Sequence, residues 1–138
     1  VEQVDFDQLL EQADFISIHT PLTEETTNLF GQEAFIRMKP EALLINTARG
    51  PLVDIDALAQ ALETGEIAGA ALDVLPQEPP PDDCPLFERD DVILTPHTGF
   101  YSADALLDLQ TTVATDVASV LNGESPRFPV NPEVRDLK

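Results

Sequence analysis

Three side chains in this sequence could together form an acid–base site for a substrate that carries a carboxylate. They are Arg49, Glu78 and His97. A histidine beside a carboxylate is a common general acid–base pair, because the carboxylate orients the ring and favours its protonated form. An arginine nearby offers a planar pair of donors to a substrate carboxylate. Each residue alone also has an ordinary structural explanation, as a surface arginine, a loop glutamate or a turn histidine. The proposed chemistry therefore requires a fold that brings all three together.

Four short apolar runs predict the strands of such a fold. They cover residues 15–18, 42–45, 67–72 and 92–94. The runs are nearly continuous rather than alternating, which is typical of strands buried on both faces of a parallel sheet. Helical patterns accompany them at residues 6–10, 33–38, 55–63 and 102–122. This order predicts an α/β fold, with a parallel sheet, flanking helices and a long C-terminal helix.

Individual residues mark where these elements begin and end. Asp54 is a suitable N-cap for the third helix, and Gly65 is placed to end it. Gly123 is expected to close the long helix in the same way. We therefore predict one domain over residues 1–123 and a proline-rich C-terminal tail over residues 124–138.

The segments that follow the four apolar runs are rich in polar residues. They are His19-Thr20-Pro21, Asn46-Thr47-Ala48-Arg49-Gly50, Asp73 and Thr95-Pro96-His97-Thr98-Gly99. In open parallel sheets, ligands bind outside the carboxyl ends of the strands. The sequence therefore predicts one shared site at that edge of the sheet.

The composition excludes several classes of protein. Of 138 residues, 26 are acidic and seven are basic, which gives a formal net charge of −19. This balance argues against binding to nucleic acid or to an anionic membrane, since both need basic patches. The single cysteine, Cys84, and two histidines form no metal-ligand pattern, so no metal is expected. Acids spread along the whole chain favour a salt-adapted, halophilic source, with an ordinary acidic domain as the alternative.

Several longer motifs stand in order along the chain. They are Ala13-Asp14, Ile18-His19-Thr20-Pro21-Leu22-Thr23, Met38-Lys39-Pro40, Ile45-Asn46-Thr47-Ala48-Arg49-Gly50-Pro51-Leu52-Val53-Asp54, Gly69-Ala70-Ala71-Leu72-Asp73-Val74, Glu78-Pro79, Thr95-Pro96-His97 and Val130-Asn131-Pro132. In this order and spacing, the chain closely resembles the D-isomer-specific 2-hydroxyacid dehydrogenases over roughly residues 9 to 131. The resemblance implies a nicotinamide-dependent oxidoreductase, cytoplasmic and homodimeric when intact, that acts on a small 2-oxo or 2-hydroxy acid.

The resemblance also assigns the catalytic roles. His97 would protonate the carbonyl oxygen as hydride arrives, and would act as the base in the reverse reaction. Glu78 would hold the imidazole, and Arg49 would bind the substrate carboxylate and polarise the carbonyl. NAD is the implied cofactor. NADP is not excluded, because the residues that separate the two are not found in this sequence.

The same resemblance implies the contacts to the cofactor. On the adenosine side they fall on Thr20, Pro21 and Thr26. At the nicotinamide end they fall on Thr47, Ala48, Arg49, Asp73, His97, Thr98, Gly99 and Phe100, with Asp73 placed for the carboxamide. The stretch from His97 to Ser102 is more similar to the D-lactate dehydrogenase and C-terminal-binding-protein corepressor branches. A non-enzymatic, NAD-sensing interaction protein is therefore the alternative function.

One family feature is not present. The phosphate-binding pattern Gly-x-Gly-x-x-Gly does not occur among the six glycines, and neither does the acidic residue that should follow it. The family places both before the position that corresponds to Val1, and it adds a separate substrate-binding domain. The resemblance therefore implies that residues 1–123 are a partial, Rossmann-like NAD-binding domain, the second half of the complete one. We expect this chain to be inactive by itself, and to come from a longer enzyme or to be prepared as an isolated half-domain.

Overall fold

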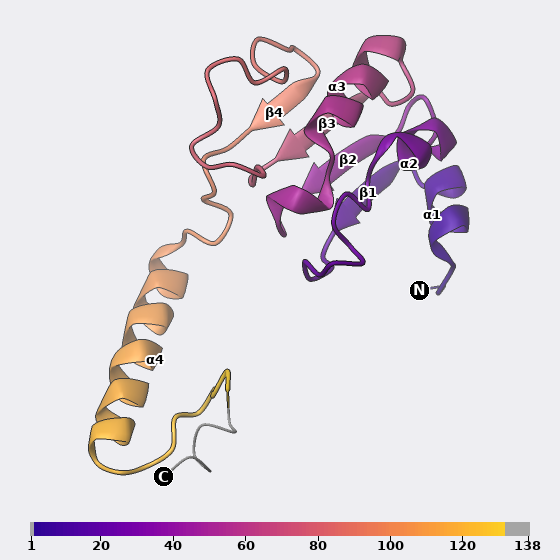
Figure 1. Ribbon diagram of the computed structural model, residues 1–138. Helices are drawn as coiled ribbons and strands as arrows, with labels where there is room; N and C mark the ends of the chain where they lie inside the picture. The colour runs from indigo at the N-terminus through magenta and orange to yellow at the C-terminus, as the bar shows by residue number, and fades with distance from the viewer. Residues whose placement is uncertain (1, 132–138) are drawn as a thin grey trace. The chain divides into compact units, whose positions relative to one another are not determined.

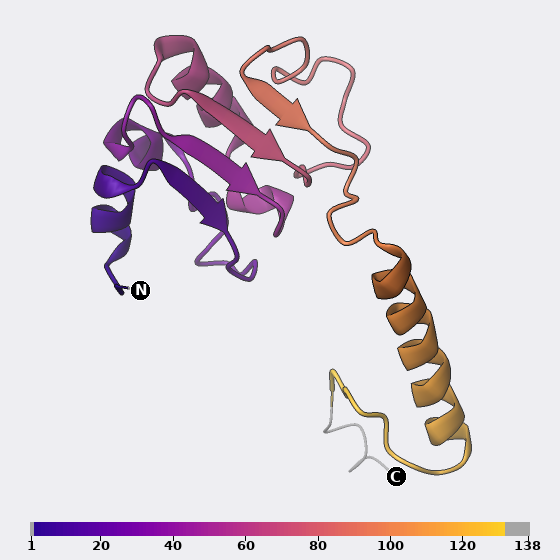
Figure 2. The same cartoon turned by 180° about the vertical axis from the view of Figure 1, so that it is seen from behind.

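The computed structural model describes residues 2–131, which fall into two compact units. The first unit ends at Gly99 and the second begins at Phe100. The first is built on a parallel sheet with the strand order β1-β2-β3-β4. Its strands are β1 (Phe15–Ile18), β2 (Leu43–Asn46), β3 (Gly69–Leu72) and β4 (Val92–Leu94), seen side by side in Figure 2. The α/β class and the parallel sheet predicted from the sequence are confirmed.

Short helices precede the first three strands. They are α1 (Phe6–Gln12), α2 (Gln32–Arg37), the 3₁₀ turn η1 (Gly50–Leu52) and α3 (Ile55–Thr64). The Asp54 carboxylate accepts hydrogen bonds from the backbone N–H groups at the start of α3. Gly65 ends that helix in the left-handed conformation, with φ of 74°, which a glycine adopts without steric cost. Both predicted ends of α3 are confirmed.

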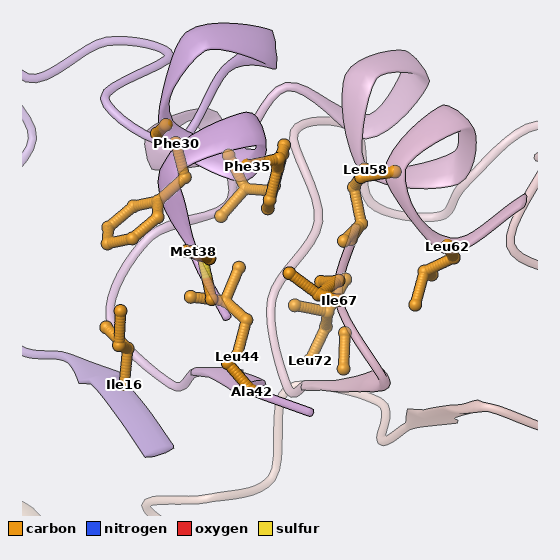
Figure 3. Close-up of a cluster of buried hydrophobic side chains, with 14 of the residues drawn as sticks. Ile16, Phe30, Phe35, Met38, Ala42, Leu44, Leu58, Leu62, Ile67 and Leu72 are labelled. Carbon is orange, nitrogen blue, oxygen red and sulfur yellow. The ribbon is translucent and has the colours of Figure 1, made fainter. Parts of the chain in front are cut away.

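The core lies between these helices and one face of the sheet (Figures 1 and 3). Phe35 of α2 and Leu58 of α3 are both fully buried, and both lie above Leu44 of β2. At about 25 cal/mol per Å² of apolar surface, each such side chain contributes about 1.5–3 kcal/mol by leaving water. This packing holds the strands in register, so that their carboxyl ends form one edge.

The expectation that the strands are buried on both faces is wrong for the first unit. Residues on β1 alternate between exposed and buried, and Phe15 is 67% exposed. Ile93 of β4 is exposed to the same extent. Helices α1, α2 and α3 all lie on one side of the sheet, and the β3–β4 connection is irregular in the structure. The runs are apolar at consecutive positions in the sequence, although the helices pack against only one face of the sheet.

The second unit consists of α4 (Ala103–Leu121) and the segment after it. Ser102 caps the helix through a hydrogen bond from the Ala105 N–H, and Gly123 follows it with φ of 81°. Residue 123, the predicted domain boundary, follows the end of this helix. The predicted division into domains stays a prediction; the two compact units divide after residue 99. Part of the predicted tail, together with Pro132 of its motif, lies outside the described residues. No helix within residues 2–131 is long and apolar enough to span a membrane.

Candidate active site

The end of β2 forms a tight turn that presents Arg49. The Asn46 side chain accepts a hydrogen bond from the Ala48 N–H (3.0 Å) and donates one to the Arg49 carbonyl (2.9 Å). The Arg49 guanidinium is exposed and donates from Nη1 to the Ala48 carbonyl (2.7 Å). Proline at position 51 then starts the 3₁₀ turn, since its fixed φ suits a first helical turn. Arg49 therefore lies at the carboxyl edge of the sheet, as predicted.

Gly50 allows the Arg49 turn to approach the loop that follows β3. A Cβ atom at this position would overlap the backbone of Leu75 and Pro76. Only a residue without a side chain fits such a close approach of two backbones. Because the Leu75 loop continues to Glu78, this contact brings the segments of two candidate catalytic residues together.

Glu78 and His97 form a hydrogen-bonded pair. The distance between His97 Nδ1 and Glu78 Oε2 is 2.8 Å, and the other carboxylate oxygen accepts a hydrogen bond from the Leu75 N–H (2.9 Å). The hydrogen bond from His97, followed by that from Leu75, lowers the pKa of Glu78 below its ordinary value. Glu78 is thus ionised near neutral pH and held at both oxygens, so that it orients the imidazole.

All three candidate catalytic residues line one pocket. It has a volume of about 220 Å³, and Gly50, Pro51, Val74, Leu75 and Pro76 complete its wall. A second pocket of about 370 Å³ has Glu78 and His97 in its wall, and its other residues include Leu75, Phe87 and Leu94. The arrangement places a cation, a carboxylate and an imidazole around a space that a small organic acid could enter.

Asp73, at the end of β3, holds the turn that carries His97. Its carboxylate is 7% exposed and accepts hydrogen bonds from the Thr95 hydroxyl, the Thr98 N–H (2.9 Å) and the Gly99 N–H (2.8 Å). His97 itself has a φ of 54°, in the left-handed region that costs a non-glycine residue free energy. Asp73 therefore stabilises a backbone conformation that would otherwise be unfavourable.

These hydrogen bonds lower the pKa of Asp73 below its ordinary value, and the bond from Thr95 is the largest cause. A group with a depressed pKa in the folded state adds stability above its ordinary pKa of about 3.9. That stability is lost as the pH falls through the lowered value. Asp73→Asn should reduce the free energy of unfolding at pH 7 by about 1–3 kcal/mol, because its amide would face the Gly99 N–H donor.

Denaturant unfolding of both proteins between about pH 7 and pH 2 measures this difference. It should narrow below about pH 4, where Asp73 of the unfolded chain takes up its proton before Asp73 of the folded chain does. Asp90→Asn, at an exposed acid, is the matched control and should change neither the stability nor its pH dependence. A constant difference between wild type and Asp73→Asn across this pH range would contradict the assignment.

The residues predicted for the adenosine side lie at the end of β1. A pocket of about 500 Å³ is lined by His19, Thr20, Pro21, Leu22, Ala48 and Arg49. The Thr26 hydroxyl donates to the Pro21 carbonyl (2.8 Å) and accepts from the Thr23 N–H (2.7 Å), so Thr26 stabilises the turn that follows. The structure thus brings Thr20 and Pro21 together with Ala48 and Arg49 around this pocket. Thr26 supports them through its hydrogen bond to the Pro21 carbonyl.

The other predicted cofactor contacts have different surroundings. Thr47 is exposed at the tip of the Arg49 turn. Thr98 and Gly99 donate their backbone N–H groups to Asp73. Phe100 belongs to the second unit, where its ring contacts that of Tyr101 edge-on. Within the first unit, the geometry therefore joins most of the predicted contacts at one sheet edge.

Two residues of the site were not singled out from the sequence. Asn46 and Thr95 both make side-chain hydrogen bonds that hold the turns carrying Arg49 and His97. Their position directly next to an apolar run could have indicated them, because a polar side chain at a buried strand end must find a hydrogen-bond partner. The Nε2 atom of His19 is hydrogen-bonded to the Ser17 hydroxyl (2.8 Å). No cluster of three possible metal ligands occurs between residues 2 and 131.

A parallel α/β sheet with its polar site outside the carboxyl ends of the strands defines a Rossmann-like nucleotide-binding domain. The family model "D-isomer specific 2-hydroxyacid dehydrogenase, NAD binding domain" matches residues 1–99. The chain therefore belongs to the D-isomer specific 2-hydroxyacid dehydrogenase family, and its residues 1–99 match the NAD-binding domain. The resemblance inferred from the sequence is confirmed.

Named relatives agree with this assignment. The chain is 48% identical over 138 residues to a glyoxylate reductase from Thermofilum pendens, covering 100% of this chain and 41% of the relative. It is 44% identical over 131 residues to chloroplastic D-3-phosphoglycerate dehydrogenase 2 from Arabidopsis thaliana, covering 95% of this chain and 21% of the relative. The crystal structure of D-lactate dehydrogenase with NAD⁺ from Lactobacillus jensenii superposes with a TM-score of 0.85 at 40% identity. That match covers 92% of this chain and 42% of the other. The chain thus spans well under half the length of these relatives.

Proposed function

We propose that the protein carrying this chain is a nicotinamide-dependent 2-hydroxyacid dehydrogenase, which transfers hydride between NAD(P)H and a small 2-oxo acid. The observation that supports this most directly is the single pocket lined by Arg49, Glu78 and His97, with His97 bonded to Glu78. The reaction needs three things from the protein: a site for the substrate carboxylate, a proton for the carbonyl oxygen, and a support for the proton donor. Each is supplied by one of these residues.

In the reduction, Arg49 binds the substrate carboxylate through its planar pair of N–H donors and so orients the adjacent carbonyl. His97 gives its proton to the carbonyl oxygen as negative charge develops there. Glu78 holds the ring through Nδ1 and stabilises the charged imidazole before that transfer. In the oxidation, His97 removes the hydroxyl proton, and Glu78 then stabilises the charge that the ring has gained.

The residues at the sheet edge fit a nicotinamide dinucleotide. The 500 Å³ pocket at the ends of β1 and β2 joins Thr20, Ala48 and Arg49, so hydroxyl and backbone groups surround a space beside the acid–base pocket. Arg49 lines both pockets, which places the two ligands next to each other. The cofactor, when bound, supplies or accepts the hydride. Thr20, Pro21, Thr47, Ala48 and Asp73 would hold it, and Thr26 would support the turn beside them.

Steady-state assays of the complete protein that carries this sequence test the proposal. Glyoxylate, pyruvate, hydroxypyruvate and phosphohydroxypyruvate should each be offered with NADH and with NADPH. Glyoxylate is the first choice, since several relatives are named glyoxylate reductase. We expect reduction of at least one 2-oxo acid. Tight NADH binding without turnover of any of them would instead support the interaction-protein alternative, which the named enzymes above do not favour.

We further propose a cytoplasmic, homodimeric enzyme from a salt-adapted cell. The charge of −19 supports the last point. Most basic side chains within residues 2–131 already pair with acids: Arg37 with Asp7, Lys39 with Asp14, Arg89 with Asp91 and Arg127 with Asp116. Many surface carboxylates are left to repel one another, and the sum of these weak interactions destabilises the compact state in dilute buffer.

The melting temperature should therefore rise steeply with chloride up to about 1 M. The Debye length falls from about 30 Å at 0.01 M salt to about 3 Å at 1 M, so molar salt removes most of the repulsion. A triple variant, Glu2→Lys, Glu41→Lys and Asp90→Lys, changes three exposed acids and should lose much of this dependence. Sulfate is the comparison salt, because it also strengthens apolar burial. A wild-type melting temperature that stays flat from about 0.05 to 1 M chloride would contradict salt adaptation.

A further inference from the structure

Asn46 is the one polar residue of the described strands that is completely buried, with 0% of its surface exposed. A buried amide is costly unless its donor and its acceptor both find partners. The Asn46 Oδ1 accepts from the Ala48 N–H (3.0 Å), and its Nδ2 donates to the Arg49 carbonyl (2.9 Å). Its own backbone carbonyl accepts from the Asp73 N–H (2.9 Å). The residue therefore joins β2, the Arg49 turn and the end of β3.

The two side-chain bonds enclose the peptide unit between Ala48 and Arg49. One holds the Ala48 N–H, which precedes this unit, and the other holds the Arg49 carbonyl, which follows it. The Ala48 carbonyl within the unit in turn accepts from the Arg49 guanidinium (2.7 Å). The direction in which the Arg49 side chain leaves the backbone is thus set by a buried side chain three residues earlier in the chain.

We propose that Asn46 is a positioning residue that aims the Arg49 guanidinium at the substrate carboxylate, and that it thereby determines selectivity for charged 2-oxo acids over their uncharged analogues. This inference rests on the proposed function. Asn46 touches neither substrate nor cofactor in this scheme. It acts only through the turn that it holds.

The side-chain chemistry at position 46 gives two informative variants. Asn46→Asp has nearly the same shape and keeps an acceptor for the Ala48 N–H, but it replaces the donor with an oxygen that faces the Arg49 carbonyl. Asn46→Ala removes both bonds and leaves two part-buried backbone groups without these partners. Both changes should release the Arg49 turn. Leu58→Val, in the core of α3 and away from the site, is the control for a general loss of stability.

The experiment measures the ratio of kcat/KM for pyruvate to that for pyruvamide, its uncharged amide, or for the matching pair of the fastest 2-oxo acid found. A smaller fraction of folded enzyme lowers both values equally and cancels from this ratio. We expect Asn46→Asp and Asn46→Ala to lower the ratio by about 10- to 100-fold, the usual consequence of a misplaced orienting group. The ratio for Leu58→Val should equal that of the wild type. In Arg49→Gln, where the ratio is already low, adding Asn46→Ala should lower it by less than about twofold.

Each outcome is decisive. If the ratio in both Asn46 variants equals that of the wild type while both kcat/KM values fall together, Asn46 is merely structural and the inference is overturned. The inference is also overturned if the fold-changes in this ratio caused by Asn46→Ala and by Arg49→Gln multiply fully in the double variant, because the two residues would then act independently. A wild type that reduces the acid and the amide equally would overturn the role of Arg49 and this inference with it. A wild type that reduces no 2-oxo acid would overturn the proposed function itself, which the substrate assays already reveal.

Discussion

Replacing His97 with asparagine in the complete protein should lower kcat by about 10²- to 10⁴-fold. A positioned general acid contributes this much, because the carbonyl oxygen must otherwise take its proton from water. Asparagine retains a polar group that can bond Glu78, but it cannot transfer a proton near neutral pH. The pocket and the turn should therefore persist while the proton transfer is lost.

The measurement is steady-state kinetics over about pH 5 to 10, in both reaction directions. Glu78→Gln is the informative companion, since it leaves the imidazole in place and removes the charge that supports it. It should lower kcat less than His97→Asn does. Asp90→Asn, at an exposed acid that lines none of the pockets described above, is the control and should retain the wild-type activity. Activity of His97→Asn close to that of the wild type at every pH would show that His97 is not the acid.

Arg49→Gln should lower kcat/KM for a 2-oxo acid by about 30- to 1,000-fold. Removing one partner of a charged, hydrogen-bonded pair typically costs about 2–4 kcal/mol, and each 1.4 kcal/mol is a factor of ten. Because Arg49 orients the carbonyl as well as binding the carboxylate, kcat and KM should both change. Arg49→Lys keeps the charge but loses the planar pair of donors, so its loss should be intermediate.

Arg37→Gln is the matched control, since Arg37 lies on α2 and pairs with Asp7 and Glu11. It should leave kcat/KM within about twofold of the wild type, because exposed ion pairs contribute little. Isothermal titration with NADH separates substrate from cofactor effects, and the affinity for NADH should change much less than kcat/KM in Arg49→Gln. A kcat/KM for Arg49→Gln within a factor of about three of the wild type would contradict the assigned role.

Local patterns were sufficient to predict most of the elements. The four apolar runs became β1 to β4 with shifts of at most two residues, because a short apolar run bounded by turn residues favours a strand. Asp54 and Gly65 bound α3 as expected, since a carboxylate bonds free N–H groups and a glycine accepts a positive φ. The order of strands and helices then placed the polar segments at one edge of the sheet. These features depend only on neighbours in the chain or on general rules of topology.

The site itself depended on contacts between distant segments. That Arg49 and Glu78 share a pocket follows from the close approach of Gly50 to Leu75, which no local pattern reveals. Which face of the sheet the helices cover likewise depends on the path of each connection between strands. These features arise from the packing of residues far apart in sequence.

The sequence by itself thus determined the class of fold, the family and the three candidate catalytic side chains, because those depend on residue type and order. Only the tertiary structure showed what holds these side chains in place. Asn46 holds the Arg49 turn through two side-chain hydrogen bonds, and Asp73 stabilises the left-handed turn at His97. Both are buried polar groups at strand ends, and both must bond whatever backbone the fold brings to them. Their partners are therefore decided by three-dimensional packing, and their roles became visible only when that packing was known.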